Sequence, residues 1–442
     1  MNSSPPTIAF KDALMFWLKL GFISFGGPAG QIALMHQELV EKRRWISEKR
    51  FLHALNYCMV LPGPEAQQLA TYMGWLMHKT WGGVVAGTLF VLPSLLILIG
   101  LSWIYIGFGH TALVAGLFYG IKPAVTAIVL QAVYRIGSRT LKHPLLWTVA
   151  AASFIAIFAG NVPFPLIIIA AAVIGYFGQR LTPSAFNGGG SHGQAKASSG
   201  PAIIDDDSPT PEHARFTWAR FSTVLLCGFA LWAIPMAIFT LSLGWDHTLT
   251  QMGWFFTKAA LLTFGGAYAV LPYVYQGAVE FFGWLSPTQM IDGLALGETT
   301  PGPLIIVVAY VGFIGGYLKQ LFGPDALFLA GAAGATVVTW FTFLPSFLFI
   351  LGGGPFIEST HNNLKLSAPL TAITAAVVGV ILNLALFFAY HVWWPNGLQA
   401  SVDWASAAMT IGACVALIRF KRDVVHVIVI SGLLGLLLRT VL

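Results

Sequence analysis

The sequence predicts an all-α polytopic membrane protein made of two inverted-topology repeats, with helices that are broken or re-entrant. Three observations support this fold class. Of the 442 residues, 57% are hydrophobic and only 9% are charged, which is too little polar material to cover a water-soluble globule of this size. Long stretches of the first half recur in the second half at a fixed spacing. Basic residues surround Trp45 in the first copy and are missing around the matched Trp284 in the second.

The repeat is found by aligning the sequence on itself. At an offset of 239 residues, the separation of Phe16 from Phe255, residues 16–64 align on 255–303 without a gap. Rare residue types match in pairs: Lys19 with Lys258, Phe25-Gly26-Gly27 with Phe264-Gly265-Gly266, Trp45 with Trp284, Ser47 with Ser286, and Pro62-Gly63-Pro64 with Pro301-Gly302-Pro303. Further along, Leu92-Pro93-Ser94 resembles Leu344-Pro345-Ser346. We therefore expect an N-terminal repeat at 1–178 and a C-terminal repeat at 216–442.

The interval 179–215 between the repeats has a different composition. It contains the run Gly188-Gly189-Gly190, several Ser and Pro residues, and the run Asp205-Asp206-Asp207. Such a segment cannot bury an apolar face. We expect a disordered cytoplasmic linker here.

Loop charge predicts that the two repeats face opposite ways. The stretch 42–50 around Trp45 is rich in Lys and Arg, whereas the matched stretch around Trp284 has neither. Because cytoplasmic loops carry an excess of Lys and Arg, the first loop should lie inside the cell and the second outside. One pattern in two orientations is the plan of many secondary transporters. The N-terminus is then cytoplasmic, the C-terminus is outside, and apolar spans lie at 80–108, 111–134, 144–160, 161–178, 216–243, 325–352, 367–390, 402–418 and 424–441.

Four segments do not fit a simple span and are expected to be re-entrant. Each is interrupted by Gly or Pro near its middle, which leaves arms of about a dozen residues, shorter than the roughly 20 that a span needs. The segments are 11–40, 51–78, 250–279 and 289–319. The helix that carries Lys19 could instead be a complete tilted span.

The breaks are the predicted site. Pro removes a backbone donor and Gly permits positive φ, so Pro-Gly-Pro leaves unpaired peptide groups, which the membrane tolerates only beside protein or a water-filled cavity. A half-helix that begins at a break presents free N–H groups and a positive dipole end to an anion. The alternative is that these residues mark only turns or kinks. The substrate-binding candidates are Lys19, Gly26, Gly27, Pro62, Gly63, Pro64, Gln67, Lys258, Gly265, Gly266, Thr300, Pro301, Gly302 and Pro303.

Charged residues inside apolar segments are the second group of candidates. Lys19 and Lys258 precede the two Phe-Gly-Gly breaks by six residues, and a Lys at the bilayer centre costs about 2.5–3.5 kcal/mol. They bind an anion or a carboxylate there, or they extend to an interface. Lys122 and Lys365 form a looser pair. The buried carboxylates Glu65, Glu298 and Asp292 are candidates for proton coupling or, equally, for ion pairs with the lysines.

Other functions are disfavoured by what the sequence lacks. The basic residues are dispersed among loops, so nucleic acid is not an expected partner. The three cysteines are far apart and form neither a disulfide framework nor a metal site. No catalytic constellation, nucleotide-binding motif or cofactor motif is present. We expect no enzyme, no metal and no cofactor.

The motifs Phe25-Gly26-Gly27-Pro28-Ala29-Gly30, Trp45-Ile46-Ser47, Leu61-Pro62-Gly63-Pro64, Thr263-Phe264-Gly265-Gly266-Ala267-Tyr268 and Thr300-Pro301-Gly302-Pro303 resemble those of the chromate ion transporter (CHR) family in its long, two-domain form. The resemblance covers nearly the whole chain apart from the linker. It implies export of chromate from the bacterial cytoplasm across the inner membrane, driven by the proton-motive force, with sulfate as a competitor.

Three other functions stay open at this stage. One is a proton-coupled uptake carrier for sulfate or another anion, and another is an anion channel whose broken helices form a filter. A membrane-embedded chromate reductase would need a redox cofactor, for which no ligation pattern is present. The expected partners are chromate and the lipid bilayer. A homodimer is a candidate assembly.

Overall fold

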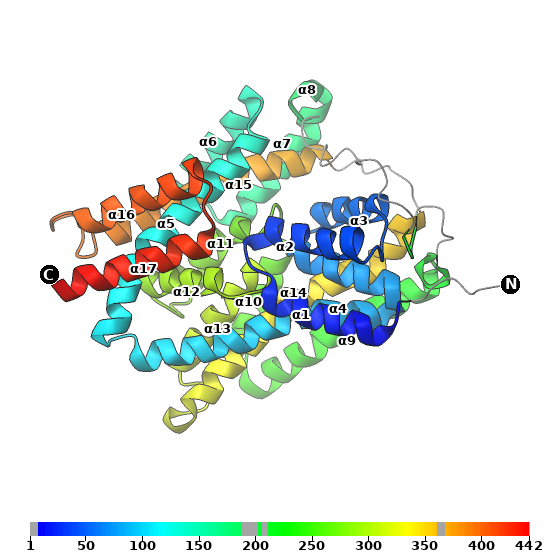
Figure 1. The fold of residues 1–442 in the computed structure, drawn as a ribbon, viewed down its shortest axis with the longest axis horizontal. Helices are drawn as coiled ribbons and strands as arrows, with labels where there is room; N and C mark the ends of the chain where they lie inside the picture. The colour runs from blue at the N-terminus through cyan, green and yellow to red at the C-terminus, as the bar shows by residue number, and fades with distance from the viewer. Residues whose placement is uncertain (1–7, 187–201, 206–210, 360–366, 442) are drawn as a thin grey trace.

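The computed structural model describes residues 8–186, 202–205, 211–359 and 367–441, and these residues are almost entirely helical (Figure 1). The helices of the first half are α1 (Phe10–Ile23), α2 (Gly27–His36), η1 (Gln37–Lys42), α3 (Glu48–Val60), α4 (Glu65–Phe108), α5 (Ala112–Thr140), α6 (Pro144–Phe158), α7 (Phe164–Leu181) and α8 (Pro183–Phe186). Those of the second half are η2 (Glu212–Ala214), α9 (Trp218–Leu243), α10 (Thr248–Leu261), α11 (Ala267–Tyr275), η3 (Gln276–Phe281), α12 (Pro287–Thr299), η4 (Leu304–Ile306), α13 (Val307–Leu318), η5 (Pro324–Ala326), α14 (Leu327–Ser359), α15 (Ser367–Trp393), α16 (Trp404–Cys414), η6 (Val415–Arg419) and α17 (Val424–Val441).

The predicted all-α membrane fold is confirmed. Six of the described helices are long and apolar enough to cross a membrane, judged by length and composition, and several shorter apolar helices accompany them. Their outer faces carry large exposed apolar side chains, such as Leu241 at 86% and Leu226 at 69% exposure on α9. A bilayer makes such an exterior favourable, whereas water does not.

The helices before the breaks are short. α1 and α10 have 14 residues each, and α3 and α12 have 13 each. At 1.5 Å per residue such a helix is about 20 Å long, less than the roughly 30 Å of a bilayer core. These helices are broken elements rather than continuous spans.

α4 folds back on itself near its first third. Lys79 has a positive φ of 58° and interrupts the helix. A Cβ on Gly74 would lie 2.4 Å from the carbonyl oxygen of Gly82, and one on Gly87 would lie 2.3 Å from Thr71 Oγ1. The two arms of α4 are therefore packed side by side, and small residues at the contact permit this close approach.

Helix bounds recur between the halves at the spacing seen in the sequence. The π-helices η1 and η3 begin at Gln37 and Gln276. α3 and α12 each follow a serine, Ser47 and Ser286, whose hydroxyl accepts a hydrogen bond from a backbone N–H in the first turn, the usual N-cap arrangement. These bounds do not fix how the halves are oriented, so the inverted topology stays a prediction.

The two halves share one packed interior. α15 contacts α5, α6 and α7, while α14 packs on α4. In Figure 1 the second-half helices α14 and α15 accordingly run among helices of the first half. Breaks in one half can therefore meet those in the other.

The structure differs from the predicted disorder over part of the interval 179–215. The end of α7, the whole of α8 and the whole of η2 fall inside it. Residues 202–205 lie along the loop before α3, where the Ile204 N–H donates to the carbonyl of Trp45 at 3.0 Å. Ile204 also packs against the buried apolar cluster that includes Leu39, Ile46 and Phe51. This burial offsets the conformational entropy that the segment loses on ordering. The rest of the predicted linker, residues 187–201 and 206–210, lies outside the described residues.

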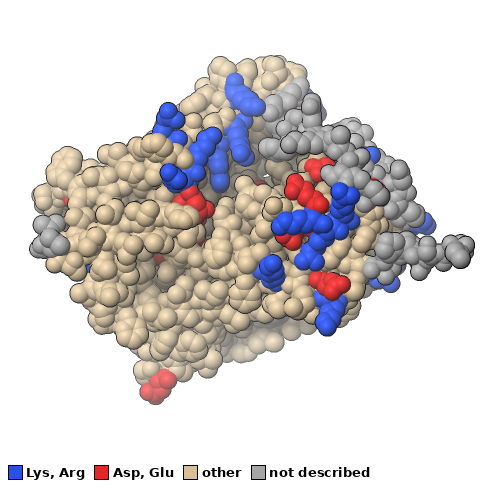
Figure 2. Space-filling view, in the orientation of Figure 1, with Lys and Arg blue, Asp and Glu red and all other residues tan. Residues whose placement is uncertain are grey.

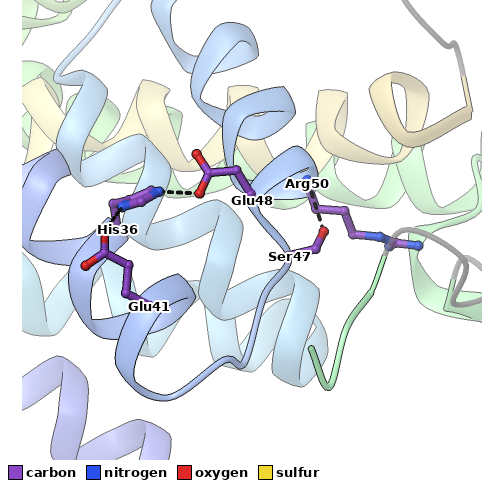
Figure 3. A network of polar contacts seen from close by, with 5 residues as sticks. All are labelled: His36, Glu41, Ser47, Glu48 and Arg50. Atoms are coloured by element: carbon purple, nitrogen blue, oxygen red, sulfur yellow. Dashed lines mark hydrogen bonds and ion pairs between the residues drawn. The ribbon is translucent and has the colours of Figure 1, made fainter. Parts of the chain in front are cut away.

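The loop between η1 and α3 is held by polar contacts. His36 places Nε2 2.6 Å from Glu48 and Nδ1 3.4 Å from Glu41 (Figure 3). Lys42 and Glu38 pair on η1 at 2.7 Å. Figure 2 shows Lys and Arg side chains gathered with acidic ones around α2 and α3, and further basic side chains beside α6.

Candidate functional site

Two of the predicted breaks are Pro-Gly-Pro turns, one between α3 and α4 and the other between α12 and η4. Their glycines have φ of 125° at Gly63 and 99° at Gly302, values that only glycine adopts without strain. Space is also limited, since a Cβ on Gly63 would lie 2.5 Å from Ser346 Oγ and one on Gly302 would lie 1.9 Å from Ser94 Oγ. Both turns require glycine for conformation and for room.

The other two breaks are the Gly-Gly pairs between α1 and α2 and between α10 and α11. Their four residues all have positive φ: 87° at Gly26, 68° at Gly27, 81° at Gly265 and 97° at Gly266. They are at least partly exposed, whereas the glycines of the Pro-Gly-Pro turns are buried. α2 and α11 thus begin at partly open positions.

Two hydrogen bonds join the breaks reciprocally across the halves. The Gly63 N–H donates to the carbonyl of Thr263 at 2.7 Å, and the Gly302 N–H donates to the carbonyl of Ser24 at 2.8 Å. The two donors are 239 residues apart, and so are the two acceptors. The two bonds are therefore the same contact made once in each direction between the halves. Each bond thus joins a Pro-Gly-Pro turn of one half to the Gly-Gly break of the other, and contacts between α11 and η4 connect the two pairs. We call the region of the four breaks the junction.

Side chains strengthen this junction. Gln31 Nε2 donates to the carbonyls of Ser24 at 3.2 Å and Gly302 at 2.5 Å. Ser94 Oγ donates to the carbonyl of Pro301 at 2.5 Å. Sequence reasoning did not select Ser24, Gln31 or Ser94 as site residues. The only sequence signal was the repeated Leu-Pro-Ser motif that contains Ser94.

Half-helices begin at the junction. Pro64 and Pro303 are the N-cap residues of α4 and η4, and the first N–H groups of a helix have no acceptor within it. Gln67 lies in the first turn of α4 and is fully buried. The Thr300 hydroxyl donates to the carbonyl of Gly297 at 2.9 Å, within its own helix end.

Several buried polar atoms near the breaks have no hydrogen-bond partner among the described residues. They are the amide oxygens of Gln31, Gln67 and Gln68 and the hydroxyl of Ser346. Buried polar groups in proteins are nearly always satisfied, and exceptions point to bound water or a ligand. The junction therefore offers unused hydrogen-bonding capacity in addition to its helix ends.

Two carboxylates flank the junction, and one cation acts on both. Glu65 opens α4, and Glu298 lies at the end of α12. The Tyr268 hydroxyl donates to Glu298. Arg135 of α5 interacts electrostatically with Glu65 and with Glu298. Arg135 was missed as a site residue because basic residues at a helix end are usually a signal of topology.

Lys19 and Lys258 are not brought to the junction. Both side chains lie on exposed faces of α1 and α10. Lys258 Nζ lies 5.7 Å from the ring centroid of Trp254, a cation–π distance. Their role in anion binding stays a prediction without a contact to support it.

Asp292 forms an ion pair away from the breaks. Its Oδ1 lies 3.5 Å from Lys122 Nζ, and its Oδ2 accepts a hydrogen bond from the Tyr105 hydroxyl at 2.7 Å. Lys122, a member of the looser lysine pair, is thus the ion-pair partner of Asp292, and a role of Asp292 in proton coupling stays a prediction. Lys365, the other member of the looser lysine pair, lies outside the described residues.

Among the residues that the structure describes, no group of three or more His, Cys, Asp and Glu side chains could hold a metal ion. Cys58 is buried, Cys414 is half-buried and Cys227 is exposed, and all three are free.

Comparison with known proteins identifies the family. The profile described as "Chromate transporter" matches residues 11–176 and 250–436. A chromate transport protein of Pseudomonas aeruginosa is 34% identical over 382 residues, 85% of this chain and 80% of that protein. One of Cupriavidus metallidurans is 28% identical over 419 residues, 94% of this chain and 90% of that protein. An uncharacterized transporter of Bacillus subtilis is 30% identical over 151 residues, 34% of this chain and 76% of that protein. No solved structure matches the chain significantly. With matches to the family profile in both halves and full-length relatives of this similarity, the chain belongs to the chromate transporter family.

Proposed function

We propose that this chain exports chromate from the cytoplasm across the bacterial inner membrane, driven by the proton-motive force, and so confers resistance to chromate. The names of its relatives support chromate as the transported ion. The observation that carries the proposal is the junction of four helix breaks inside a multi-pass membrane protein. Broken helices at the centre of a bundle are the usual substrate sites of secondary transporters.

The junction suits a tetrahedral oxyanion. Half-helix N-termini at α2, α4, α11 and η4 offer N–H groups and positive dipole ends. Unpartnered groups such as Ser346 Oγ can replace hydrogen bonds that the ion loses when its water molecules are removed. Arg135 supplies positive charge. Sulfate has the same shape and charge as chromate, so we expect it to compete. Lys19 and Lys258 enter this scheme only if the helices rearrange during transport.

Two arguments, one from the charge of the substrate and one from the chain, support the direction and the driving force of transport. Moving one charge through 100 mV is worth about 2.3 kcal/mol, so a dianion gains about 4.6 kcal/mol per 100 mV on leaving an inside-negative cell. Glu65 and Glu298 flank the junction, where a carboxyl that takes up a proton would change the charge presented to the anion.

We further propose that residues 1–178 and 216–442 are inverted repeats that rock about the junction in alternating access. The N-terminus is then cytoplasmic and the C-terminus outside. Reciprocal bonds across the junction support this, since symmetry-related contacts of this kind form around a two-fold axis.

Everted membrane vesicles test the proposal. Vesicles that contain the protein should accumulate labelled chromate when their lumen is acidified, and excess sulfate should suppress the accumulation. Uptake only in right-side-out vesicles would instead indicate an anion uptake carrier. Flux that follows voltage linearly, without exchange of one anion for another, would indicate a channel. No chromate flux in vesicles shown to hold folded protein would move the substrate to another anion.

A further inference from the structure

A cavity of about 530 Å³ lies apart from the junction, among α4, α5, α12, α15, α16 and α17. α5, α12, α16 and α17 lie together at the end of the molecule that also holds the C-terminus (Figure 1). The polar lining of the cavity includes Tyr119, Lys122, Asp292, His391, Asp403 and Arg439. The cavity is large enough to hold many water molecules. On the orientation proposed above, it opens toward the outside of the cell.

Asp292 is the buried carboxylate of this lining. Its side chain is only 4% exposed, whereas its partner Lys122 is 26% exposed. Asp292 Oδ1 has no hydrogen-bond partner among the described residues, although the Lys122 ammonium lies 3.5 Å away. This oxygen thus lies in the lining of the cavity with the Lys122 ammonium as its neighbouring cation.

Titratable groups from several helices surround Asp292, and each affects its ionisation. They are Tyr105 from α4, Tyr119 and Lys122 from α5, Tyr310 from α13, His391 from α15, Asp403 from α16 and Arg439 from α17. Three of these contact one another: Tyr119 donates to Asp403 at 2.9 Å, and the Arg439 guanidinium lies 5.7 Å from the Tyr119 ring centroid. Lys122 is the cation that pairs with Asp292 directly.

Asp292 is linked mechanically to the junction. It shares the short helix α12 with Glu298, six residues on and about 9 Å along the axis. That helix ends directly before the turn that contains Gly302. A change in the contact between Asp292 and Lys122 therefore acts on α12, the helix that ends at one of the breaks.

The opposite half shows a comparable tie. On α3, which corresponds to α12 in the repeat, Arg50 Nη1 lies 3.9 Å from Glu358 of α14, and the Tyr72 hydroxyl also donates to Glu358 at 2.5 Å. In each half a charged pair thus joins the half-helix to a long helix, and the carboxylate of that pair accepts a hydrogen bond from a tyrosine of α4. The two pairs differ in one respect. In the pair of α12 the half-helix itself carries the carboxylate, and that carboxylate lines the cavity, whereas in the pair of α3 the half-helix carries the arginine.

We propose that Asp292 is the residue that takes up the driving proton from the external cavity, and that Lys122 is the counter-charge that holds α12 to α5 until it does. This rests on the proposed proton-driven transport. When a proton from cavity water binds Asp292 Oδ1, the ion pair with Lys122 is lost and α12 is released from α5. When the proton leaves toward the cytoplasm, the pair forms again.

Purified protein in proteoliposomes tests this with two reactions. The first is accumulation of labelled chromate driven by an acidic lumen. The second is exchange of labelled for unlabelled chromate at equal pH, which needs no net proton movement. Asp292→Asn, which keeps the shape and cannot be ionised, should lose the driven accumulation and keep exchange. Asp292→Asn that still accumulates chromate like the wild type overturns the proposal, and so does a folded variant that has lost both reactions.

Two further variants sharpen the test. Lys122→Gln leaves the carboxylate without its cation, so the pH at half-maximal coupled transport should rise. An unchanged pH profile contradicts the assigned role of Lys122. Asp403→Asn is the matched control, since Asp403 lines the same cavity and caps α16, a role that asparagine can also fill. It should leave coupling intact, and loss of coupling here would mean that any charge change in the cavity has the same effect.

Folding and function can be separated. If Asp292→Asn inserts poorly, the double variant Asp292→Asn/Lys122→Gln removes both charges of the pair and should fold, with the same loss of driven accumulation. Wild-type protein that moves no chromate would refute the proposed function. Wild-type protein that couples chromate to protons, together with an Asp292→Asn variant that does so equally well, would refute only the role of Asp292.

Discussion

Replacing Gly302 by alanine should disrupt the junction, and the structure gives the size of the effect. At φ of 99° an L side chain is strained by roughly 1–3 kcal/mol. The new Cβ would also lie 1.9 Å from Ser94 Oγ and 3.0 Å from Ser94 Cβ, and overpacking of this kind costs about 1–3 kcal/mol. The total of roughly 2–6 kcal/mol is a large part of the 5–15 kcal/mol that stabilises a typical protein. We expect a large fall in thermal stability and loss of chromate transport.

Thermal unfolding in detergent, followed beside transport in vesicles, measures this. Gly412→Ala is the matched control, because Gly412 is helical and a Cβ there meets nothing within 4 Å; alanine should be neutral or should stabilise by up to about 1 kcal/mol. Adding Ser94→Ala to Gly302→Ala removes the nearest contact but not the backbone strain, so part of the stability should return. If Gly302→Ala melts and transports like the wild type, the junction is not as tight as described. If adding Ser94→Ala restores none of the lost stability, the contribution assigned to overpacking against Ser94 is wrong.

Three other predictions concern the surroundings of the junction. Gln31→Leu removes two hydrogen bonds to carbonyl groups, each worth about 0.5–1.5 kcal/mol; it should lower the melting temperature and slow transport, and an unchanged melting curve would contradict the bridging role. The hydrogen bond from Lys42 lowers the pKa of Glu38 below its ordinary 4.5, so the stabilisation is present above that value and is lost as the pH falls through the lower, folded-state pKa. Lys42→Ala should therefore cost less than about 1 kcal/mol at pH 7 for this exposed pair, with no difference at strongly acidic pH, as urea titrations at both pH values would show. Lys19→Gln with Lys258→Gln should reduce oxyanion flux if these residues bind the ion during transport, and normal flux in the inserted double variant would remove them from the mechanism.

Much of the fold could be predicted because its signals are local. Apolar spans are set by composition, and the predicted boundary between the segments 51–78 and 80–108 coincides with the bend at Lys79. The breaks follow from Pro and Gly, whose backbone preferences do not depend on distant contacts. The order in 202–205 was not predictable from composition, because it depends on Ile204 reaching a loop far away in the sequence.

The site was predictable only in part. The break residues Gly63 and Gly302 could be named from sequence, but not the carbonyl groups that accept their N–H bonds, since those depend on how two distant segments pack. Arg135 has the sequence context of a topology signal, and only tertiary structure brings it near both Glu65 and Glu298. The exposure of Lys19 was likewise hidden, because an apolar arm does not reveal which of its faces is buried.

The reciprocal hydrogen bonds at the junction mean that neither half can complete its own turn. If the chain were cut between α8 and α9, each fragment would hold a glycine N–H whose acceptor belongs to the other fragment. A buried donor left unpaired costs about 1–3 kcal/mol, in addition to the interior that the halves share. Each fragment made singly should be degraded, while the two made together should reassemble into an active carrier. The covalent connection would then serve chiefly to supply the two halves in equal number.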